Sequence, residues 1–254
     1  MAISSFNPKT QTYTSTRPPI KLPTSPDLSL TSFIFQSTFS IPHHTALLDS
    51  KYSNETLTFL QLKAHLYSKV SQFNVPLVFL QSSSSPNLSS AIPKFSYYSD
   101  IIQNYADQHL NSNDVKQTDL AALLYSSGTT GTNKGVMLTH KNFIASTLSF
   151  TADQDRYMEG RSVCLCFLPM FHEFGSVLTL AQLRRGNVLV SMAKFGLDKV
   201  LVAIAKYKVT HMFVVPPAYG MTEACGKISM ENPKEGPPFS GSTGTLMPLI
   251  QSKQ

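Results

Sequence analysis

Charged residues are scarce in this 254-residue sequence, and so are cysteines and long apolar runs. Charged side chains make up 14% of the residues, well below the usual quarter. The net charge of +6 is spread along the chain, and Arg184-Arg185 is the only adjacent basic pair. This excludes the basic stripe of a nucleic-acid-binding protein and favours attraction to anionic small molecules such as nucleotides.

The three cysteines are too few and too clustered for a disulfide framework. Cys164 and Cys166 alternate within an apolar run, which predicts small buried side chains in a reducing compartment. No apolar stretch approaches the length that crosses a bilayer, so we expect no membrane span and no signal peptide. The first 26 residues contain no acid and faintly resemble a transit peptide, although an ordinary polar tail explains them equally well.

The chain divides by composition into three parts, which we expect to be residues 1–117, 118–226 and 227–254. The first part is patchy, with helical spacing at Leu28–Thr38 and Thr56–Val70, a short strand at Pro76–Leu80 and too few apolar elements for a core of its own. The last thirty residues are rich in Pro and Gly and predict loop and turn.

From residue 118 onward, short apolar runs alternate with helical patterns. A helix is predicted after the N-cap residues Thr139–Asn142, another ends at Gly186, and a third covers Leu197–Ala205. This alternation predicts an α/β fold, a mostly parallel sheet flanked by helices. The predicted strands are Leu120–Tyr125, Val136–Leu138, Val163–Phe167, Val188–Ser191 and Met212–Val215.

The segment Ser126–Gly135 reads SSGTTGTNKG and lies between two of these strands. Glycines allow backbone N–H groups to approach a polyanion, hydroxyls add short donors, and Lys134 adds a positive charge. The pattern therefore predicts phosphate binding. A flexible linker is the plain alternative. The segment is not the common P-loop, because Asn133 stands where that motif requires Gly before the lysine.

Together with this segment, three further stretches resemble plant 4-coumarate–CoA ligases and their relatives in the adenylate-forming superfamily. These stretches are FLPMFHEFG at 167–175, RRGNVLVSMAKF at 184–195 and YGMTEACG at 219–226. The resemblance implies the N-terminal domain of the adenylate-forming fold, without its small C-terminal domain. It also implies ATP-dependent activation of a phenylpropanoid or fatty-type carboxylic acid, with Mg²⁺ as cofactor and coenzyme A as co-substrate. We expect a cytosolic monomer. The peroxisome is an alternative because relatives occur there, although the terminal Ser252-Lys253-Gln254 is not a peroxisomal signal.

The resemblance also assigns residues. The phosphate group comprises Ser126, Ser127, Gly128, Thr129, Thr130, Gly131, Thr132 and Lys134. Tyr219, Gly220 and Met221 line the adenine side, Thr222 contacts the adenylate, and Glu223 helps to hold Mg²⁺. A carboxylate beside a hydroxyl suits Mg²⁺, which prefers one or two carboxylates plus phosphate oxygens. Thr222 and Lys134 also count as catalytic residues, and without the resemblance Glu223 would be read as a surface carboxylate.

His172 is the remaining candidate catalytic residue, because the matching histidine in the family lies near the reacting carboxylate. A hydrogen-bonded histidine at a strand end is the structural alternative. Phe174 stands where many relatives have Tyr, which favours an apolar acyl pocket. His43, His44, His140 and His211 show no metal-ligand spacing and are predicted to be structural or surface residues.

The sequence also departs from the family. Relatives carry a substantial stretch between Val-Pro-Pro and Tyr-Gly-Met-Thr-Glu, whereas here only Ala218 separates Pro217 from Tyr219. A similar jump occurs near Lys69–Asn74, and the chain stops before the family's catalytic lysine. We therefore expect a folded remnant around residues 118–217 with poorly packed flanks, and weak or absent adenylation.

Three functions remain open on the sequence alone. The first is an acid–CoA ligase. The second is a non-catalytic nucleotide-binding fragment, or a regulator of a full-length relative. The third, an ordinary P-loop NTPase, is disfavoured by the spacing of Lys134 and by the lack of an apolar strand ending in Asp downstream.

Overall fold

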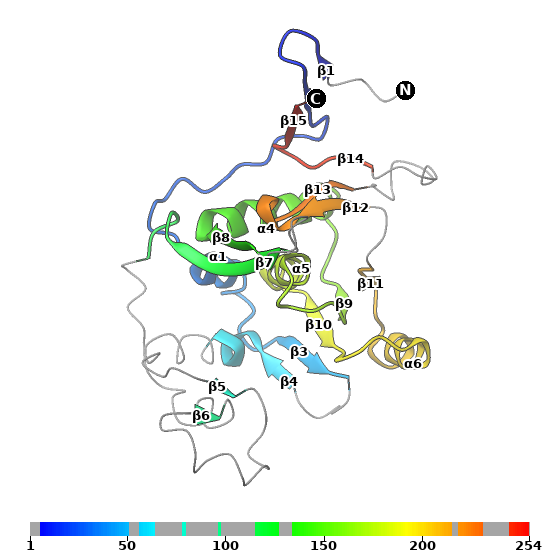
Figure 1. The fold of residues 1–254 in the computed structure, drawn as a ribbon. Helices are drawn as coiled ribbons and strands as arrows, with labels where there is room; N and C mark the ends of the chain where they lie inside the picture. Colours follow the sequence, from blue (N-terminus) through cyan, green and yellow to red (C-terminus); the bar gives the residue numbers. More distant parts are fainter. Residues whose placement is uncertain are drawn as a thin grey trace.

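A five-stranded sheet forms the centre of the computed structural model (Figure 1). The structure describes residues 6–50, 56–63, 115–126, 134–214, 218–230 and 244–253, together with the strand segments 78–79 and 96–97. The strand order is β11-β9-β10-β3-β4; the first four are parallel and β4 pairs antiparallel at the edge. These strands are β3 (Thr45–Asp49), β4 (Thr56–Thr58), β9 (Val163–Cys166), β10 (Val188–Ser191) and β11 (His211–Met212).

Helices cover both faces of this sheet, as the continuous apolar strands require. Three helices pack on one face and α6 packs on the other. The chain passes from β10 back across β9 to β11, and a right-handed crossover in that reversed direction places its helix on the opposite face. The helices are α1 (Leu30–Gln36), α4 (His140–Arg156), α5 (Glu173–Arg184) and α6 (Leu197–Tyr207).

The alternation of side chains along the strands divides the core into two layers. Cys164 and Leu189 point toward α1, α4 and α5, where they meet Ile34 of α1. Their neighbours Leu165 and Val190 are fully buried on the other face, against α6. Both layers are therefore built from the period-two pattern of the same short strands.

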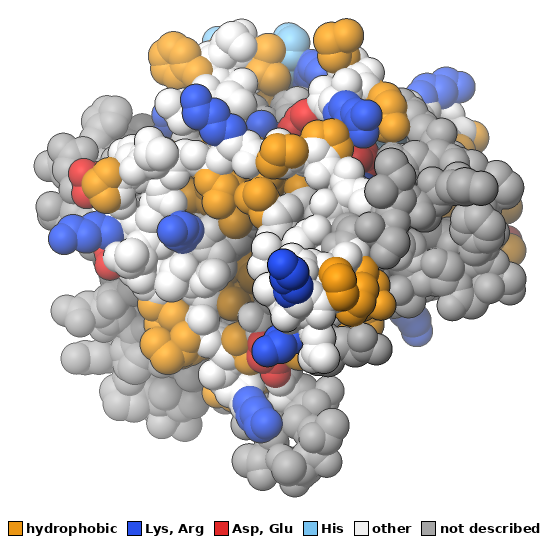
Figure 2. Space-filling model, turned by 90° about the horizontal axis from the view of Figure 1, so that it is seen from above, with side chains coloured by type: hydrophobic (Ala, Val, Ile, Leu, Met, Phe, Trp, Pro, Cys, Tyr) orange, Lys and Arg blue, Asp and Glu red, His pale blue; other side chains and the backbone are white. Residues whose placement is uncertain are grey.

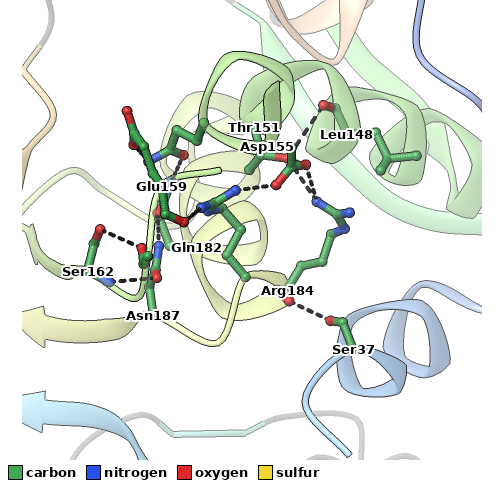
Figure 3. Close-up of polar contacts among 12 residues, drawn as sticks. Ser37, Leu148, Thr151, Asp155, Glu159, Ser162, Gln182, Arg184 and Asn187 are labelled. Atoms are coloured by element: carbon green, nitrogen blue, oxygen red, sulfur yellow. Dashed lines mark hydrogen bonds and ion pairs between the residues drawn. The ribbon is translucent and has the colours of Figure 1, made fainter. Parts of the chain in front are cut away.

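A polar network ties the C-terminal ends of α4 and α5 to the sheet (Figure 3). Asp155 of α4 accepts from Arg184 at 2.9 Å and also pairs with Arg185. Asn187 donates to Gln182 at 2.7 Å and accepts from the backbone N–H of Ser162 at 2.9 Å. Buried polar groups are stable only when paired in this way, so the network fixes how the two helices sit on β9 and β10.

Smaller sheets surround this core (Figure 1). A hairpin of β7 and β8 packs on α4, a three-stranded sheet β12-β13-β14 lies over α4 and α5, and β1-β2-β15 joins the two ends of the chain. A 3₁₀ turn, Thr222–Ala224, follows β12. The strands are β1 (Phe6–Asn7), β2 (Thr12–Thr14), β5 (Val78–Phe79), β6 (Ser96–Tyr97), β7 (Leu120–Ser126), β8 (Lys134–Thr139), β12 (Ala218–Met221), β13 (Gly226–Met230), β14 (Thr245–Leu246) and β15 (Gln251–Lys253).

The α/β prediction is confirmed, including the three helices and four of the strands predicted after residue 118. The expected strand Met212–Val215 is shorter and begins earlier, at His211–Met212, and Val215 lies outside the described residues. The helical prediction for Thr56–Val70 is wrong at its start, because residues 56–58 complete the sheet as β4 before a helix begins at 59. The β-branched Thr56 and Thr58 explain this preference.

Two expectations about the flanks are also corrected. The core is not confined to residues 118–217, because Phe33, Ile34 and Ala46 are buried in its largest cluster and β3 pairs with β10. The last thirty residues were expected to be loop and turn, but β13, β14 and β15 lie there. Short strands of mixed polarity that pair on one edge leave no periodic signal of their own.

All three cysteines are free and buried, as expected. No helix in the described ranges has both the length and the apolar character needed to span a bilayer. Seen from above (Figure 2), Lys and Arg side chains on the described part of that face are interspersed with hydrophobic and uncharged ones, without a continuous basic stripe.

Candidate functional site

The predicted phosphate segment begins at the last residue of β7 and ends within β8, and these two strands form a hairpin. The two strands pair antiparallel in a register that places Ser126 directly opposite Lys134. The two ends of the segment are therefore held side by side by backbone pairing. The residues between them that were assigned to phosphate binding lie outside the described residues: Ser127, Gly128, Thr129, Thr130, Gly131 and Thr132.

The hairpin is joined to α4 without a linker. Thr139 is the last residue of β8 and also the N-cap of α4. Its hydroxyl accepts from the backbone N–H of Asn142 at 3.2 Å, and the Asn142 side chain accepts from the Thr139 N–H at 2.9 Å. This reciprocal capping box confirms the predicted helix start and makes the direction of β8 depend on that of α4.

The structure brings Glu223 to the end of the hairpin where Ser126 and Lys134 pair. The Ser126 hydroxyl donates to Glu223 Oε1 at 2.9 Å, across 97 residues of sequence. The pKa of Glu223 is lowered by its own backbone N–H, by this hydrogen bond and by the positive charge of Lys134. Glu223 is exposed, and its carboxylate is held in the anionic form beside a lysine and a hydroxyl, a set of groups that suits a metal–phosphate complex.

The four residues before Glu223 divide between two environments. Tyr219 and Met221 are exposed, whereas Thr222 is buried at the start of the 3₁₀ turn. Gly220 approaches β13 so closely that a Cβ there would lie 2.5 Å from the Gly226 carbonyl oxygen. Only glycine fits this crossing, which explains its place in the motif.

A cavity of about 320 Å³ lies between the start of α5 and the β12–β13 pair. It is mostly apolar, and three ionisable side chains form part of its wall. This is the size and character of a small-molecule pocket. The lining residues are Leu168, Pro169, Phe171, His172, Glu173, Phe174, Gly175, Gly220, Gly226 and Lys227.

His172 is the N-cap of α5, and its ring lines this cavity. Its Nδ1 lies 3.3 Å from the backbone N of Phe174 and 2.7 Å from Glu173 Oε2. The Glu173 side chain is only 6% exposed, whereas the His172 side chain is 59% exposed. The predicted site histidine therefore lies at the cavity wall, and it is hydrogen-bonded as its alternative interpretation expected, but at the start of α5 and not at the end of a strand.

Lys227 of β13 is the third ionisable residue of the cavity wall. Its Nζ lies 3.5 Å from the centroid of the Phe150 ring and 2.7 Å from Met230 Sδ. The pKa of Lys227 is lowered to about 7, mainly by burial and also by the positive charge of Arg17, while Asp153 opposes the shift. A lysine in this position is partly neutral near pH 7.

The sequence analysis predicted the residues around the β7–β8 hairpin more completely than those of the cavity. Ser126, Lys134 and Glu223 come together, and His172 and Gly220 share the cavity. Tyr219 and Met221 do not line that cavity. Glu173 and Lys227 were missed, although an acid inside the apolar run FLPMFHEFG was a signal that could have identified Glu173. His140, predicted to be structural, accepts the Leu30 N–H of α1 at 3.0 Å.

Comparison with known proteins gives a consistent family and fold. Residues 78–218 match the family model described as AMP-binding enzyme. The chain is 41% identical over 107 residues to 4-coumarate–CoA ligase-like 6 of Arabidopsis thaliana, a match that covers 41% of this chain and 19% of that protein. The chain spans 18% to 32% of the length of the first curated relatives it matches.

Solved structures share the fold, a coenzyme A synthetase and an N-terminal domain among them. O-succinylbenzoate coenzyme A synthetase from Bacillus subtilis, in complex with ATP and a magnesium ion, aligns with a TM-score of 0.65 at 17% identity, covering 85% of this chain and 81% of that one. The inhibitor-bound N-terminal domain of FACL13 from Mycobacterium tuberculosis aligns with a TM-score of 0.60 at 16% identity, covering 74% and 63%. The described architecture is therefore that of the N-terminal domain of adenylate-forming enzymes.

Proposed function

The chain belongs to the AMP-binding enzyme family, and we propose the function of an acid–CoA ligase, which activates a carboxylic acid with ATP and passes the acyl group to coenzyme A, with at most very weak activity in this chain by itself. The acid is of the phenylpropanoid or fatty type, which suits a mostly apolar cavity of about 320 Å³. The chain acts as a monomer in this proposal.

The ATP phosphates bind at the tip of the β7–β8 hairpin. Ser126, Lys134 and the hydroxyl-rich residues between them contact the phosphate oxygens, with Lys134 neutralising part of their charge. Thr222 contacts the adenylate, while Tyr219, Gly220 and Met221 line the adenine side. Phosphate positioning and charge neutralisation are the main tasks of a protein in this kind of chemistry.

Glu223 fits the role of a Mg²⁺ ligand. No cluster of three or more acidic, histidine or cysteine side chains occurs among the described residues, so the metal would be held by one carboxylate together with phosphate oxygens and water. Bound there, Mg²⁺ supplies charge neutralisation on the phosphates. The Ser126 hydroxyl, which now donates to Glu223, orients this carboxylate toward the tip of the hairpin.

The acid occupies the cavity with its carboxylate toward His172. Phe174 and Leu168 give this pocket an apolar lining, and the helix start at α5 places N–H groups near the same wall. Charge on the reacting carboxylate is thus balanced at the cavity rim, while the rest of the acid is buried.

One observation supports this proposal above the others: the 2.9 Å hydrogen bond from Ser126 to Glu223. It joins the phosphate hairpin to the Thr222–Glu223 step, two segments that the proposed chemistry requires to act on one nucleotide. A flexible linker is not expected to form a specific hydrogen bond with this carboxylate.

Equilibrium binding of ATP with Mg²⁺ to the 254-residue chain tests the proposal. Lys134→Ala and Glu223→Gln should each weaken binding by about tenfold or more, since a charge-assisted contact contributes about 1.5–3 kcal/mol. The exposed Lys116→Ala serves as the matched control and should leave affinity unchanged. ATP–pyrophosphate exchange with hexanoic and cinnamic acids then measures activation of an acid. Equal ATP affinity in all four proteins would contradict the phosphate site.

The alternative, a non-catalytic nucleotide-binding protein or a regulator of a full-length relative, has an observation of its own. The family match ends at Ala218, at the joint where Pro217 runs almost directly into Tyr219. Binding of ATP without exchange in the presence of either acid would favour this alternative.

A further inference from the structure

One atom of His172 has two incompatible neighbours. Nδ1 lies within hydrogen-bond range of the Phe174 N–H, which can only donate, and of Glu173 Oε2, which accepts when the carboxylate is ionised. A ring nitrogen without a proton serves Phe174 and leaves Glu173 unpaired. A ring nitrogen with a proton serves Glu173 and leaves Phe174 unpaired.

The geometry favours the second arrangement. The contact to Oε2 is 2.7 Å, the length of a charge-assisted hydrogen bond, whereas the contact to Phe174 N is 3.3 Å. While Nδ1 accepts, Oε2 is buried and receives no hydrogen bond from the described residues. An unpaired buried carboxylate oxygen costs more than one unpaired N–H at a helix start that already has an exposed flank.

The other charged group of the cavity wall does not compete for this role. Lys227 lies over the Phe150 ring, and no ion pair joins it to Glu173 within the described part of the chain. The first intrahelical hydrogen bond of α5 is unaffected, because the Ser176 N–H donates to the His172 carbonyl at 3.0 Å. Moving the proton to Nδ1 therefore changes one weak contact at α5 and satisfies one buried carboxylate.

We propose that Glu173 is a positioning residue for His172, holding a proton on Nδ1 so that Nε2 is the ring atom left to contact a carboxylate in the cavity. The carboxylate partner of an imidazole fixes its tautomer and stabilises its protonated form. When Nε2 also carries a proton, the His172–Glu173 pair has no net charge and still presents an N–H donor to an anionic acid. The position of the ring proton is independent of the proposed function, whereas the contact between Nε2 and an anionic acid rests on it.

Nitrogen-15 NMR of the histidine rings in the intact chain tests the first part without any ligand. His172 is identified by the signal missing in His172→Gln. His140 is an internal control, since its Nδ1 accepts the Leu30 N–H and should carry no proton. We expect a protonated Nδ1 in His172 and an unprotonated Nδ1 in His140. An unprotonated Nδ1 in wild-type His172 would overturn the inference.

Two substitutions of Glu173 extend the test. Glu173→Gln keeps an oxygen acceptor and should keep the proton on Nδ1, whereas Glu173→Leu removes the acceptor and should move the proton to Nε2. A purely structural role would not distinguish these variants in this way. If both variants retain the wild-type ring signal, Glu173 does not position His172.

Binding of cinnamate and of the uncharged cinnamyl alcohol separates this inference from the proposed function. In Glu173→Leu the neutral ring still donates from Nε2 but lacks the charge-assisted bond of a ring protonated on both nitrogens. Cinnamate binding should therefore weaken by about threefold while cinnamyl alcohol binding is unchanged, with Glu173→Gln intermediate. Absence of cinnamate and hexanoate binding in the wild type would contradict the proposed function, while the ring signals decide on Glu173 independently. Equal loss of both ligands in Glu173→Leu would count against the positioning role.

Discussion

The two halves of the candidate site differ in the exposure of their charged side chains. At the tip of the β7–β8 hairpin, Glu223 is exposed and is stabilised by contacts with its own backbone N–H, Ser126 and Lys134. In the cavity beside α5, Glu173 and Lys227 are largely withdrawn from water, and burial dominates the behaviour of the lysine. The exposed side chains can exchange their hydrogen bonds for contacts with a ligand at little cost in free energy. The protonation states of the buried side chains in the cavity wall depend instead on whether water or a ligand fills the cavity.

The difference also concerns packing. Substitutions at the hairpin side of the site, at Ser126, Lys134 or Glu223, disturb few packing contacts. At the cavity wall, backbone segments pack directly against one another. At Gly175, a Cβ would lie 2.1 Å from the Pro169 carbonyl oxygen. We therefore expect large effects on stability from the cavity side and small ones from the hairpin side.

The largest effect is expected for Gly175→Ala. The added methyl group cannot fit against the Pro169 carbonyl, so α5 must shift, and we expect a loss of about 3 kcal/mol or more in the free energy of unfolding. Urea denaturation measures it. Gly160→Ala is the matched control, because its Cβ meets nothing within 4 Å, and it should change stability by less than about 0.5 kcal/mol. Similar values for the two variants would contradict the packing described for α5.

An intermediate effect is expected from Lys227 as pH changes. The pKa of Lys227 is about 7 in the fold and 10.5 in a free lysine, so between these values the unfolded chain binds more protons and stability rises with pH. The slope from pH 7 to 8.5 should approach about 1.4 kcal/mol per pH unit. Above about pH 9, the buried Cys164, Cys166 and Cys225 oppose this, since their raised pKa values keep them protonated only in the fold.

Lys227→Met provides the check on this prediction. The variant should flatten the stability curve between pH 7 and 8.5, while Lys116→Met, at an exposed position, should retain the wild-type slope. Denaturation at several pH values measures both. A wild-type curve that falls over this range would show that Lys227 stays charged in the fold.

The smallest effect on stability is expected for Ser126→Ala. The exposed hydrogen bond contributes less than about 0.5 kcal/mol to folding, but its removal should raise the pKa of Glu223. Lys134→Ala should raise it less, because the hydrogen bond is the larger cause of the shift. Carbon-detected NMR titration of the Glu223 carboxyl follows both variants. An unchanged titration in Ser126→Ala would separate the hairpin from the Thr222–Glu223 step.

Periodicity predicted the parts of the fold whose strands are buried on both faces. Val188–Ser191 was predicted with the bounds that the structure has, because a short apolar run between a helix stop and a turn has few other solutions. The contribution of β3 could not be predicted in the same way. Thr45–Asp49 lies in a polar part of the sequence, and only its pairing with β10, far along the chain, makes it part of the core.

The candidate site shows the same division. Motif chemistry predicted Ser126 and Lys134, whereas Thr222 and Glu223 were predicted through the resemblance to a family. Glu173 and Lys227 acquire their roles from burial; the acid inside the apolar run FLPMFHEFG was a signal for Glu173, whereas the sequence around Lys227 does not indicate a cavity. Tyr219 and Met221 lie outside that cavity because alternate residues of β12 face opposite sides.

The capping of α4 by Thr139 has a mechanical consequence. With no joint between strand and helix, Lys134 stands at the end of a stiff arm whose helical part is about 25 Å long, at 1.5 Å per residue. The far end of that arm is anchored by Asp155 to Arg184 and Arg185. We therefore expect the separation of Lys134 and Glu223 to change through displacement of the short turn Thr222–Ala224, which carries the glutamate, and not through bending of the arm.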